Sequence, residues 1–391
     1  MLEALEGSQA IARAVALCEP DVVAAYPITP QTHIVENLSV LVAEGDLHTE
    51  FVSVESEFSA ASVVLGAAAT GARAYTATAS QGVLLMAEVL FNIAGMRLPL
   101  VMTVANRAVS APLSIWNDHA DSMAVRDSGW IQLHATSNQE AVDTTIQAFR
   151  ITQETELPVM VCMDGFILTH TMEPIDLPEH EAVRDWLPPL EFSRRLDPDD
   201  PKSMGMLVTP EYFPEVRHSH HAAMLKALEV IETIDADFER AFGRAAGGLL
   251  TVEGDADAKV GIIAMGSTVG TMRAGMADFA DTAGPARLIV LRSFRPFPTQ
   301  ALREAVAELD HLIVIDRAIS PGLSGILGTE VSATLAGMEG APRVSNHALG
   351  LGGRDIPETI YADLMATVHD PDAPAFSIFD AEMEKLAPED R

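Results

Sequence analysis

Cysteine is nearly absent from this chain. Among 391 residues there are only two cysteines, Cys18 and Cys162, and neither belongs to a pair at the spacing of a metal or cluster site. We therefore expect no disulfide and no iron–sulfur cluster held by this chain alone, because such a cluster is bound by several thiolates. The chain opens without a basic region followed by an apolar stretch, so we expect no secretory signal and a cytoplasmic location.

Basic residues and long apolar runs are also scarce. The chain has 25 Lys and Arg against 56 Asp and Glu, a formal net charge of −31. We expect no nucleic acid partner, because phosphates call for a basic face. The best candidate for a membrane span, 82–104, is interrupted by Glu88, Arg97 and Pro99 and is too polar for the roughly 18–20 apolar residues needed, so we expect no membrane insertion. The acidic excess fits either a solubilising or salt-adapted surface, or a surface that faces a basic partner.

Apolar runs alternate with helical patterns in the first half of the chain. The runs are nearly continuous in apolar character and rich in Val, Thr and Tyr, as buried parallel strands are. The predicted strands are 22–26, 51–54, 73–78, 98–105 and 157–163. The predicted helices between them are 34–42, 58–69, 83–93 and 139–154. This alternation predicts an α/β fold with a doubly wound parallel sheet.

The middle of the chain differs in composition. Prolines cluster between Pro174 and Pro214 with charged residues among them, which predicts an extended crossing segment rather than a packed element. A polar helix is predicted to follow over 221–246.

A second α/β pattern occupies the last part of the chain. Its predicted strands are 260–264, 286–291 and 311–315, its predicted helices are 269–281 and 299–309, and glycine-rich turns lie at 321–325 and 350–355. We therefore expect a first domain over 1–175, a proline-rich crossing segment with a linker helix over 176–247, and a second α/β domain over 248–391.

The junction Tyr26–Thr32 is the most informative motif. Thr29 has the character of a helix N-cap, and Pro30 would then occupy the first helical position, where its missing N–H costs nothing. A helix N-terminus at the carboxyl edge of a parallel sheet also suits a carboxylate ligand. The junction therefore either starts a helix only, or starts a helix and binds a small acid.

Three further strand ends carry polar residues. Glu57 opens a very apolar helix, either as a favourable acid in the first turn or as a carboxylate that binds a cofactor from an apolar wall. The stretch 76–82 has small hydroxyls and then glycine, which fits either a tight connection or close approach of a ligand. Arg107 follows an apolar strand, where its guanidinium either grips a carboxylate or pairs with a neighbouring acid.

Two histidine-containing clusters are weaker signals. Asp118, His119 and Asp121 lie close together, but no other His or Cys cluster supports a metal there, so we expect a polar loop or a subunit contact. The run His218–His221 is interpreted as a solvated lead into the next helix. We expect no metal site in this chain.

Several nucleotide and cofactor motifs are missing. Gly254 and Asp255 resemble the start of a thiamine diphosphate motif, yet no asparagine lies in 275–288, where the motif requires one. There is no Walker A sequence, no dinucleotide-binding glycine motif and no nucleophile elbow. We expect that the chain cannot hold a diphosphate group by itself.

These stretches together resemble the α subunit of the 2-oxoacid:ferredoxin oxidoreductase family, most closely its pyruvate:ferredoxin (pyruvate synthase) branch. The resemblance spans almost the whole chain, and the order of several rare strings makes it specific. The strings are YPITPQTHIVE at 26–36, VESE at 54–57, ATASQG at 77–82, MTVANRAVSAPLSIWNDHAD at 102–121, RDSGWIQ at 126–132, FILTHTMEP at 166–174, LRSFRPFP at 291–298 and GLGGRDI at 350–356.

The resemblance implies a fold, cofactors and partners. The first domain is expected to be of the pyrimidine-binding type of thiamine diphosphate enzymes, and the second to resemble the transketolase C-terminal domain. Thiamine diphosphate would be shared with a β subunit that holds its diphosphate and a proximal 4Fe–4S cluster. Mg²⁺, the clusters and coenzyme A would lie mainly on partner subunits, which include γ and δ-type subunits, and ferredoxin or an NAD-linked subunit would accept the electrons.

The resemblance also implies roles for single residues. Glu57 matches the glutamate that hydrogen-bonds the aminopyrimidine ring, and Thr29 and Arg107 match the residues that grip the 2-oxoacid carboxylate. Further candidates are Thr78, Ser80 and Gln81 at the cofactor and Ile28 and Asn117 at the substrate. The implied reaction converts a 2-oxoacid, with pyruvate favoured, to acyl-CoA and CO2.

Three alternatives remain open. The same chemistry on phenylglyoxylate or a branched-chain 2-oxoacid, with NAD as acceptor, would use the same residues. A non-catalytic scaffold subunit would keep the fold without needing Glu57, Thr29 and Arg107 together. A free-standing transketolase-like enzyme would bind thiamine diphosphate without partners.

Overall fold

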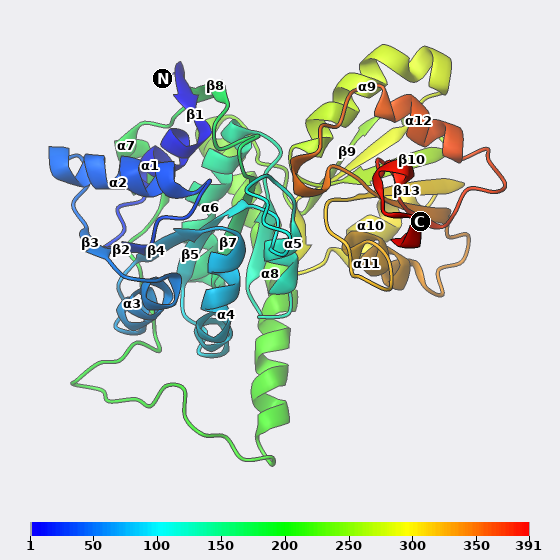
Figure 1. The fold of residues 1–391 in the computed structure, drawn as a ribbon. Helices are drawn as coiled ribbons and strands as arrows, with labels where there is room; N and C mark the ends of the chain where they lie inside the picture. Colours follow the sequence, from blue (N-terminus) through cyan, green and yellow to red (C-terminus); the bar gives the residue numbers. More distant parts are fainter. Residues whose placement is uncertain (1, 391) are drawn as a thin grey trace.

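The computed structural model describes residues 2–390, which form two α/β bodies on either side of a long helix, α8 (Phe213–Phe242) (Figure 1). The first half of the chain, coloured blue to green, makes one body, and the end of the chain, coloured yellow to red, makes the other. Both bodies contain parallel sheets, so the predicted α/β class is confirmed.

The first body is built on a seven-stranded sheet in the described part of the chain, in the order β12-β6-β7-β5-β4-β2-β3. All its pairings are parallel except that of β12. Its strands are β2 (Val22–Ala25), β3 (Glu50–Ser53), β4 (Ala74–Thr78), β5 (Leu100–Asn106), β6 (Ile131–His134), β7 (Val159–Asp164) and β12 (Ser293–Arg295). Five of these strands were predicted. Strand β6 was missed because Gln132 and His134 interrupt its apolar pattern although both are buried.

Helices cover both faces of this sheet. One apolar core joins the sheet to α1 (Gly7–Leu17), α2 (Thr32–Glu44), α6 (Asn138–Thr155) and α8, and a second joins it to α3 (Glu57–Ala69) and α4 (Ser80–Gly95). Burial of apolar side chains on both faces explains why the strands read as continuous apolar runs. The short helix α5 (Ala120–Ala124) lies beside α4 and β5.

The segment after Pro174 is more ordered than the sequence indicated. Strand β8 (Met172–Asp176) pairs antiparallel with β1 (Leu2–Glu6), and helix α7 (His180–Trp186) buries Val183. The prediction of one extended segment is therefore wrong for its first part, where apolar contacts to the α1 region hold the chain. The stretch 187–212 does run as a long connection to the start of α8 (Figure 1).

The second body is built on a six-stranded sheet within residues 2–390, in the order β15-β14-β13-β10-β11-β9. Its strands are β9 (Leu250–Gly254), β10 (Val260–Ala264), β11 (Arg287–Leu291), β13 (His311–Asp316), β14 (Arg343–Ala348) and β15 (Phe376–Ile378). Its helices are α9 (Thr268–Ala283), α10 (Thr299–Val306), α11 (Ile326–Leu335) and α12 (Ile360–Thr367). The three predicted strands and two predicted helices of this region are confirmed.

Strand β12 connects the two bodies. It follows β11 in the chain but pairs antiparallel with β6, with Ser293 opposite Leu133. We propose the three-part division at 175/176 and 247/248, with β12 as a strand that the last part contributes to the first sheet. No helix among residues 2–390 is long and apolar enough to cross a membrane.

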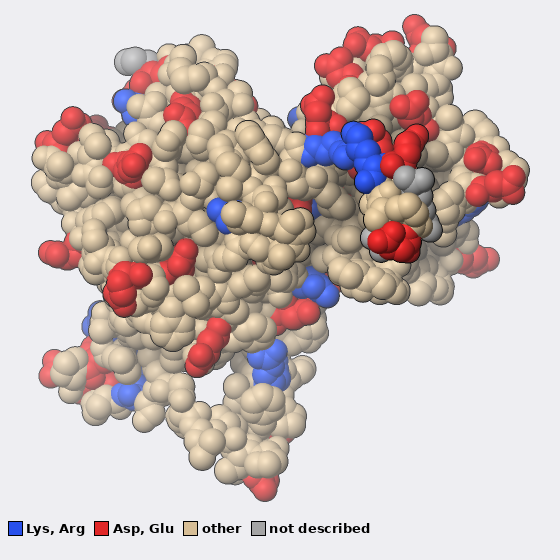
Figure 2. All heavy atoms as spheres, in the orientation of Figure 1, with Lys and Arg blue, Asp and Glu red and all other residues tan. Residues whose placement is uncertain are grey.

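Acidic side chains are spread over both bodies on the face drawn in Figure 2, and Lys and Arg are few. Such an even distribution contributes a general repulsion between molecules more than a single docking patch.

Candidate active site

The ends of several strands meet at one edge of the first sheet. Strands β5, β4, β2 and β3 are neighbours and parallel, so their carboxyl ends lie along the same edge. Thr29 and Arg107 lie in the loops that leave these ends, and Glu57 and Ser80 are the first residues of the helices α3 and α4 that follow the strands. This edge is where open α/β sheets bind ligands.

Thr29 is not the N-cap that its sequence indicates. Helix α2 begins at Thr32, and its N-cap is Gln31, which makes no side-chain cap hydrogen bond. The buried Gln31 instead donates from Nε2 to the carbonyl oxygen of Ala77 at 2.7 Å and accepts the N–H of Ile28 at 3.2 Å. Gln31 thus anchors the loop to β4, and the exposed Thr29 keeps a hydroxyl that makes no hydrogen bond to any described residue.

Arg107 contacts the same loop. Its Nη1 donates to the carbonyl oxygen of Thr29 at 2.6 Å, and its Nη2 donates to Oε1 of Gln81 at 2.7 Å. Its Nε is buried without a partner among the described residues, and the side chain is only 7% exposed. Burial lowers the pKa of Arg107, and the carboxylates of Asp121 and Glu57 oppose that shift. The structure therefore brings Thr29 and Arg107 together, and no ion pair to a described acid occupies the guanidinium.

Glu57 lies in an apolar wall. It is the first residue of α3, whose N-cap Ser56 accepts the N–H of Ser59, and its side chain is 7% exposed. It makes no hydrogen bond with the described residues. A Cβ on Gly82 would lie 2.9 Å from Glu57 Oε1, so only glycine leaves room for the carboxylate there. The hydroxyl of Thr78, also buried beside Gly82, has no partner in the described part of the chain.

Asp121 organises this edge, a role that its sequence context did not reveal. Its carboxylate accepts the backbone N–H groups of Ser80 at 2.8 Å and Arg107 at 3.0 Å, and the side-chain N–H of Asn106 at 2.8 Å. It also accepts the N–H of Ser122. Burial raises the pKa of Asp121 to about 6, and these hydrogen bonds act against the rise. We call Asp121, Ser80, Asn106, Arg107 and Ser122 the Asp121 cluster.

Ser80 and Gln81 are positioned by this cluster. Ser80 has a φ of +49°, a left-handed conformation that non-glycine residues adopt rarely, and the bond from its N–H to Asp121 holds it there. Its hydroxyl lies within hydrogen-bond distance of Oε1 of Gln81 and the carbonyl oxygen of Ala108. Gln81 is thereby fixed beside Arg107.

His119, two residues before Asp121 in the chain, belongs to a second buried cluster. His119 Nε2 lies 2.8 Å from Asp164 Oδ1, and Arg317 donates to the same carboxylate at 3.2 Å. The N–H of Ser267 donates to Asp164 at 2.9 Å. We call Asp164, His119, Ser267 and Arg317 the Asp164 cluster; it joins the end of β7 to loops of the second body. His119 lies in a polar loop, as predicted, but it is 1% exposed because the loop packs between the two bodies.

Asp118 and Asn117 lie between the two bodies. Asp118 accepts the N–H of Gly352, and burial raises its pKa. Asn117 donates to the carbonyl oxygen of Asn106 at 3.3 Å, while its Oδ1 is buried without a partner among residues 2–390. Asn117 lines a cavity of about 380 Å³ with Phe166 and Arg317. Ile28 is half-buried in the Thr29 loop.

The run His218–His221 lies inside α8 and not before it, and three of its residues, His218, Ser219 and His221, are exposed as expected. His220 is 6% exposed and contacts the carbonyl oxygen of Gly129 through Nε2 at 3.1 Å. Packing against Gly129 buries this side chain, which no local pattern could indicate.

The groups left without partners fit the aminopyrimidine end of thiamine diphosphate. That ring presents nitrogen donors and acceptors and a flat apolar face. Glu57 offers a free carboxylate, Thr78 a free hydroxyl, and Gly82 permits close approach. Buried polar groups are almost always satisfied in a finished structure, so unpaired ones at a sheet edge indicate a ligand.

Two family profiles match the chain. The profile described as pyruvate flavodoxin/ferredoxin oxidoreductase, thiamine diP-bdg covers residues 13–236. The profile described as pyruvate:ferredoxin oxidoreductase core domain II covers residues 258–359.

Curated relatives are similar over most of their length. The chain is 47% identical to pyruvate synthase subunit PorA of Methanosarcina barkeri, covering 90% of this chain and 89% of the relative. It is 46% identical to the subunit of the same name from Methanocaldococcus jannaschii, with 91% and 92% covered. It is 38% identical to ketoisovalerate oxidoreductase subunit VorA of Pyrococcus abyssi, with 90% and 89% covered.

Solved structures share the fold. A 2-oxoglutarate:ferredoxin oxidoreductase from Magnetococcus marinus superimposes with a TM-score of 0.70 at 19% identity, over 93% of this chain, which spans 64% of that chain. A split-gene transketolase superimposes with a TM-score of 0.55 at 14% identity, over 93% and 98% of the two chains. With the profile matches and the curated relatives, the conclusion is plain: the chain belongs to the pyruvate flavodoxin/ferredoxin oxidoreductase family and carries its thiamine diphosphate-binding domain.

Proposed function

We propose that the chain is the α subunit of a multisubunit 2-oxoacid:acceptor oxidoreductase. The complex oxidatively decarboxylates a 2-oxoacid, pyruvate in our proposal, to acyl-CoA and CO2 and passes the electrons through 4Fe–4S clusters to ferredoxin. The observation that carries this proposal is the sheet edge where Glu57, Thr29 and Arg107 converge with unpaired polar groups. A scaffold subunit would not need a Glu57 carboxylate and an Arg107 guanidinium without ionic partners at the edge where such sheets bind ligands.

Glu57 is proposed to bind the cofactor. Thiamine diphosphate supplies the carbon nucleophile and the electron sink of the reaction. The Glu57 carboxylate would hold a proton against a ring nitrogen of the aminopyrimidine, and its apolar wall makes that hydrogen bond stronger than it would be in water. Thr78, Ser80 and Gln81 would border the same ring.

Arg107 and Thr29 are proposed to bind the substrate carboxylate. The buried guanidinium, with Nε unpaired and two donors on neutral oxygens, has no carboxylate partner among the described residues and is free to take one. The free hydroxyl of Thr29 lies on the same loop, and Ile28 and Asn117 would border the rest of the acid. Holding the carboxylate in this way orients the bond that breaks when CO2 leaves.

The remaining cofactors are proposed to lie on partners. Both cysteines are buried, and burial raises the pKa of each thiol, so neither offers an accessible thiolate for a cluster. A β subunit would hold the diphosphate, Mg²⁺ and the proximal cluster, and γ and δ-type subunits would carry the further clusters and the coenzyme A site. The names of the relatives, each a subunit, support such an assembly. We propose a cytoplasmic location.

Substrate and partner dependence test the proposal. The assembled complex is offered pyruvate, 2-oxoisovalerate, phenylglyoxylate and 2-oxoglutarate with coenzyme A, and reduction of ferredoxin or NAD is followed. We expect the highest kcat/KM with pyruvate, since the relatives with the higher identities are pyruvate synthase subunits. Preference for a branched-chain acid would overturn the substrate assignment alone, and no 2-oxoacid oxidation at all would overturn the function.

Calorimetry with the isolated subunit separates a partner-dependent subunit from a free-standing transketolase-like enzyme. We expect no tight binding of thiamine diphosphate to the chain alone and tight binding to the complex.

A further inference from the structure

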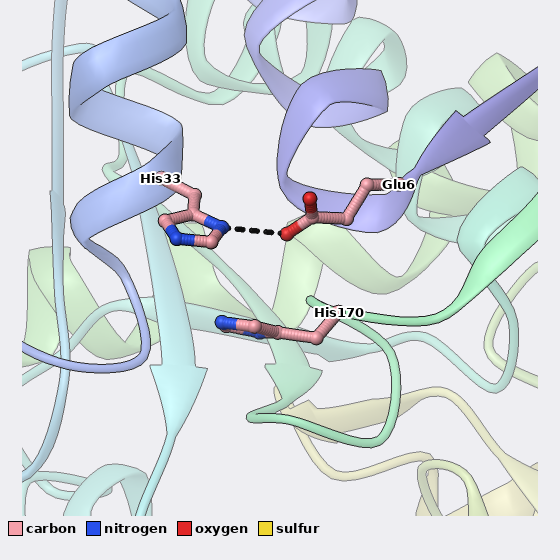
Figure 3. Close-up of side chains that lie close together, drawn as sticks. All are labelled: Glu6, His33 and His170. Atoms are coloured by element: carbon pink, nitrogen blue, oxygen red, sulfur yellow. Dashed lines mark hydrogen bonds and ion pairs between the residues drawn. The ribbon is translucent and has the colours of Figure 1, made fainter.

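A carboxylate and two imidazoles converge where one end of the β1–β8 ladder lies beside the first turn of α2. Glu6 is the last residue of β1, His33 is the second residue of α2, and His170 lies in the turn between β7 and β8 (Figure 3). The three side chains come from three segments that are distant in sequence and point toward one another. All three are half-buried, so they are held in place and remain reachable from solvent.

The donor atoms are close together. His33 Nδ1 lies 2.7 Å from Glu6 Oε1, and one ligand atom from each of the three residues lies within 4.8 Å of the others. Zinc binds imidazole nitrogen and carboxylate oxygen at about 2.0–2.2 Å, which places donors of a tetrahedral site about 3.3 Å apart. Closing the cluster from its present spacing needs only side-chain rotation, which half-buried side chains can make.

The surroundings favour coordination by His170. Its Nδ1 lies 2.7 Å from the hydroxyl oxygen of Thr169, which also accepts the N–H of Phe166. A hydroxyl oxygen has two lone pairs, so it can accept from both. His170 would then carry its proton on Nδ1 and present the lone pair of Nε2, which is the arrangement usual for metal-bound histidine.

A simple ion pair accounts for only part of this cluster. Glu6 and His33 alone would pair, as Glu19 and His180 do at 2.8 Å elsewhere on the surface. The second imidazole distinguishes the two places: the rings of His33 and His170 lie 4.7 Å apart between centroids and are tilted by 33°. Two imidazolium groups so close would repel, whereas two neutral imidazoles beside a carboxylate can share one cation.

We propose that Glu6, His33 and His170 form a binding site for a divalent transition metal of the zinc class. Two imidazole nitrogens and one carboxylate oxygen are ligands that suit zinc and its neighbours in the first transition row, and they do not suit Mg²⁺ or Ca²⁺, which prefer oxygen alone. The acidic net charge of the chain adds attraction for a cation. This site does not depend on the proposed enzymatic function.

The bound metal would join the N-terminal β1–β8 ladder to the first turn of α2. His33 is separated by three residues from Thr29, so the ion would fix the helix that follows the Thr29 loop. We therefore expect metal to raise the thermal stability of the chain and to act as a structural tie between these segments.

Calorimetric titration of the chelator-treated full chain with ZnCl2 tests the site. We expect one strong site per chain and a higher melting temperature with zinc. His33→Ala and His170→Ala should each weaken binding by at least about tenfold, since loss of an outer-shell partner alone weakens metal sites by that factor. The matched control is His180→Ala, which removes the histidine of the Glu19 pair and should leave binding unchanged.

Cobalt provides a readout that does not depend on variants that fold poorly. The unmodified chain with CoCl2 should show the intense visible absorption of low-coordinate Co²⁺, and equimolar ZnCl2 should abolish it. His33→Gln, a milder change, should lose that absorption. The proposal is overturned if the unmodified chain binds no zinc, or if zinc binding and the cobalt spectrum persist unchanged in both the His33 and the His170 variants.

Discussion

Two buried aspartates of this chain perform opposite tasks. Asp164 accepts from a histidine and an arginine, which hold the pKa of its carboxyl well below the usual range. Asp121 accepts only N–H groups that carry no net charge, and burial raises the pKa of its carboxyl to about 6. The comparison teaches that burial alone does not set the role of a carboxylate; the charge of its partners does.

The two clusters also differ in which parts of the molecule they hold together. In the Asp164 cluster the carboxylate is saturated by both bodies of the molecule, which is what a structural joint requires. The Asp121 cluster holds the backbone of two strand ends within the first body, beside Glu57 and the buried, unpaired Thr78 Oγ1 and Arg107 Nε of the proposed ligand site. We therefore expect changes at the Asp164 cluster to cost stability and changes at the sheet edge to cost activity.

The largest expected effect on stability is that of Asp164→Ala. It leaves the buried Arg317 without its counter-charge and His119 without its hydrogen-bond partner, and breaking a buried pair costs about 3–5 kcal/mol. Urea unfolding of the purified chain measures the loss. The exposed Asp185→Ala is the control and should stay within about 0.5 kcal/mol of the unmodified chain. If Asp164→Ala lost no more stability than this control, the Asp164 cluster would not be the structural joint that distinguishes it from the Asp121 cluster.

Arg107→Ala should raise the KM for the 2-oxoacid about 10–100-fold, because a hydrogen bond to a charged group is worth about 1.5–3 kcal/mol. Steady-state kinetics of the assembled complex give the KM, and calorimetry gives the thiamine diphosphate affinity, which should change little. Arg107→Lys keeps the positive charge but loses the two parallel donors of the guanidinium, so it should recover part of the substrate affinity that Arg107→Ala loses. Equal loss of cofactor and substrate would contradict the assignment.

Two glycines, one beside each carboxylate, offer steric tests of the two roles. A Cβ on Gly82 would lie 2.9 Å from Glu57 Oε1, and a Cβ on Gly266 would lie 2.8 Å from Asp164 Oδ1. Overpacking costs about 1–3 kcal/mol in either case, and Gly266→Ala adds backbone strain because Gly266 has a φ of +64°. Only Gly82→Ala should also lower kcat of the folded complex, because it displaces Glu57. Melting temperature and kcat are measured on both variants. A lower kcat in folded Gly266→Ala, or a normal kcat in Gly82→Ala, would contradict this prediction.

The smallest expected effect is a pH dependence of stability. A carboxyl whose pKa is raised by folding takes up its proton in the folded state first, so Asp121 makes the chain more stable as pH falls from about 7 through about 6. The unmodified chain should therefore gain stability relative to Asp121→Asn over that range, by about 1 kcal/mol per pH unit at most. The difference between the unmodified chain and Asp164→Asn should stay constant there, since the Asp164 carboxyl titrates far lower.

Sequence patterns were sufficient where one local signal dominates. Most strands and helices of both sheets follow from apolar runs and helical periodicity. The sequence identified three candidate site residues, Glu57, Thr29 and Arg107, because each follows a recognisable strand end. Parallel strands bring such ends together at one edge of the sheet. The resemblance to a family, rather than spacing, suggested their chemistry.

Long-range contacts explain what the sequence did not reveal. Asp121 lies in a polar loop, and only the folded chain brings it to the N–H groups of Ser80 and Arg107. The prediction that Thr29 caps helix α2 was wrong. The helix begins at Thr32, and the side chain of its N-cap residue, Gln31, donates a hydrogen bond to β4. Strand β12 pairs across the two bodies, which no local pattern encodes.

The most direct test of the sheet edge as a catalytic site is the Glu57→Gln variant of the assembled complex. Its 2-oxoacid-dependent reduction of an electron acceptor is compared with that of the unmodified complex at equal cofactor loading. Glutamine keeps the size and removes the proton-holding carboxylate, so we expect kcat to fall by about 10²–10⁴-fold with an unchanged melting temperature. Near-normal turnover in a fully assembled Glu57→Gln complex would contradict the proposed role of this site.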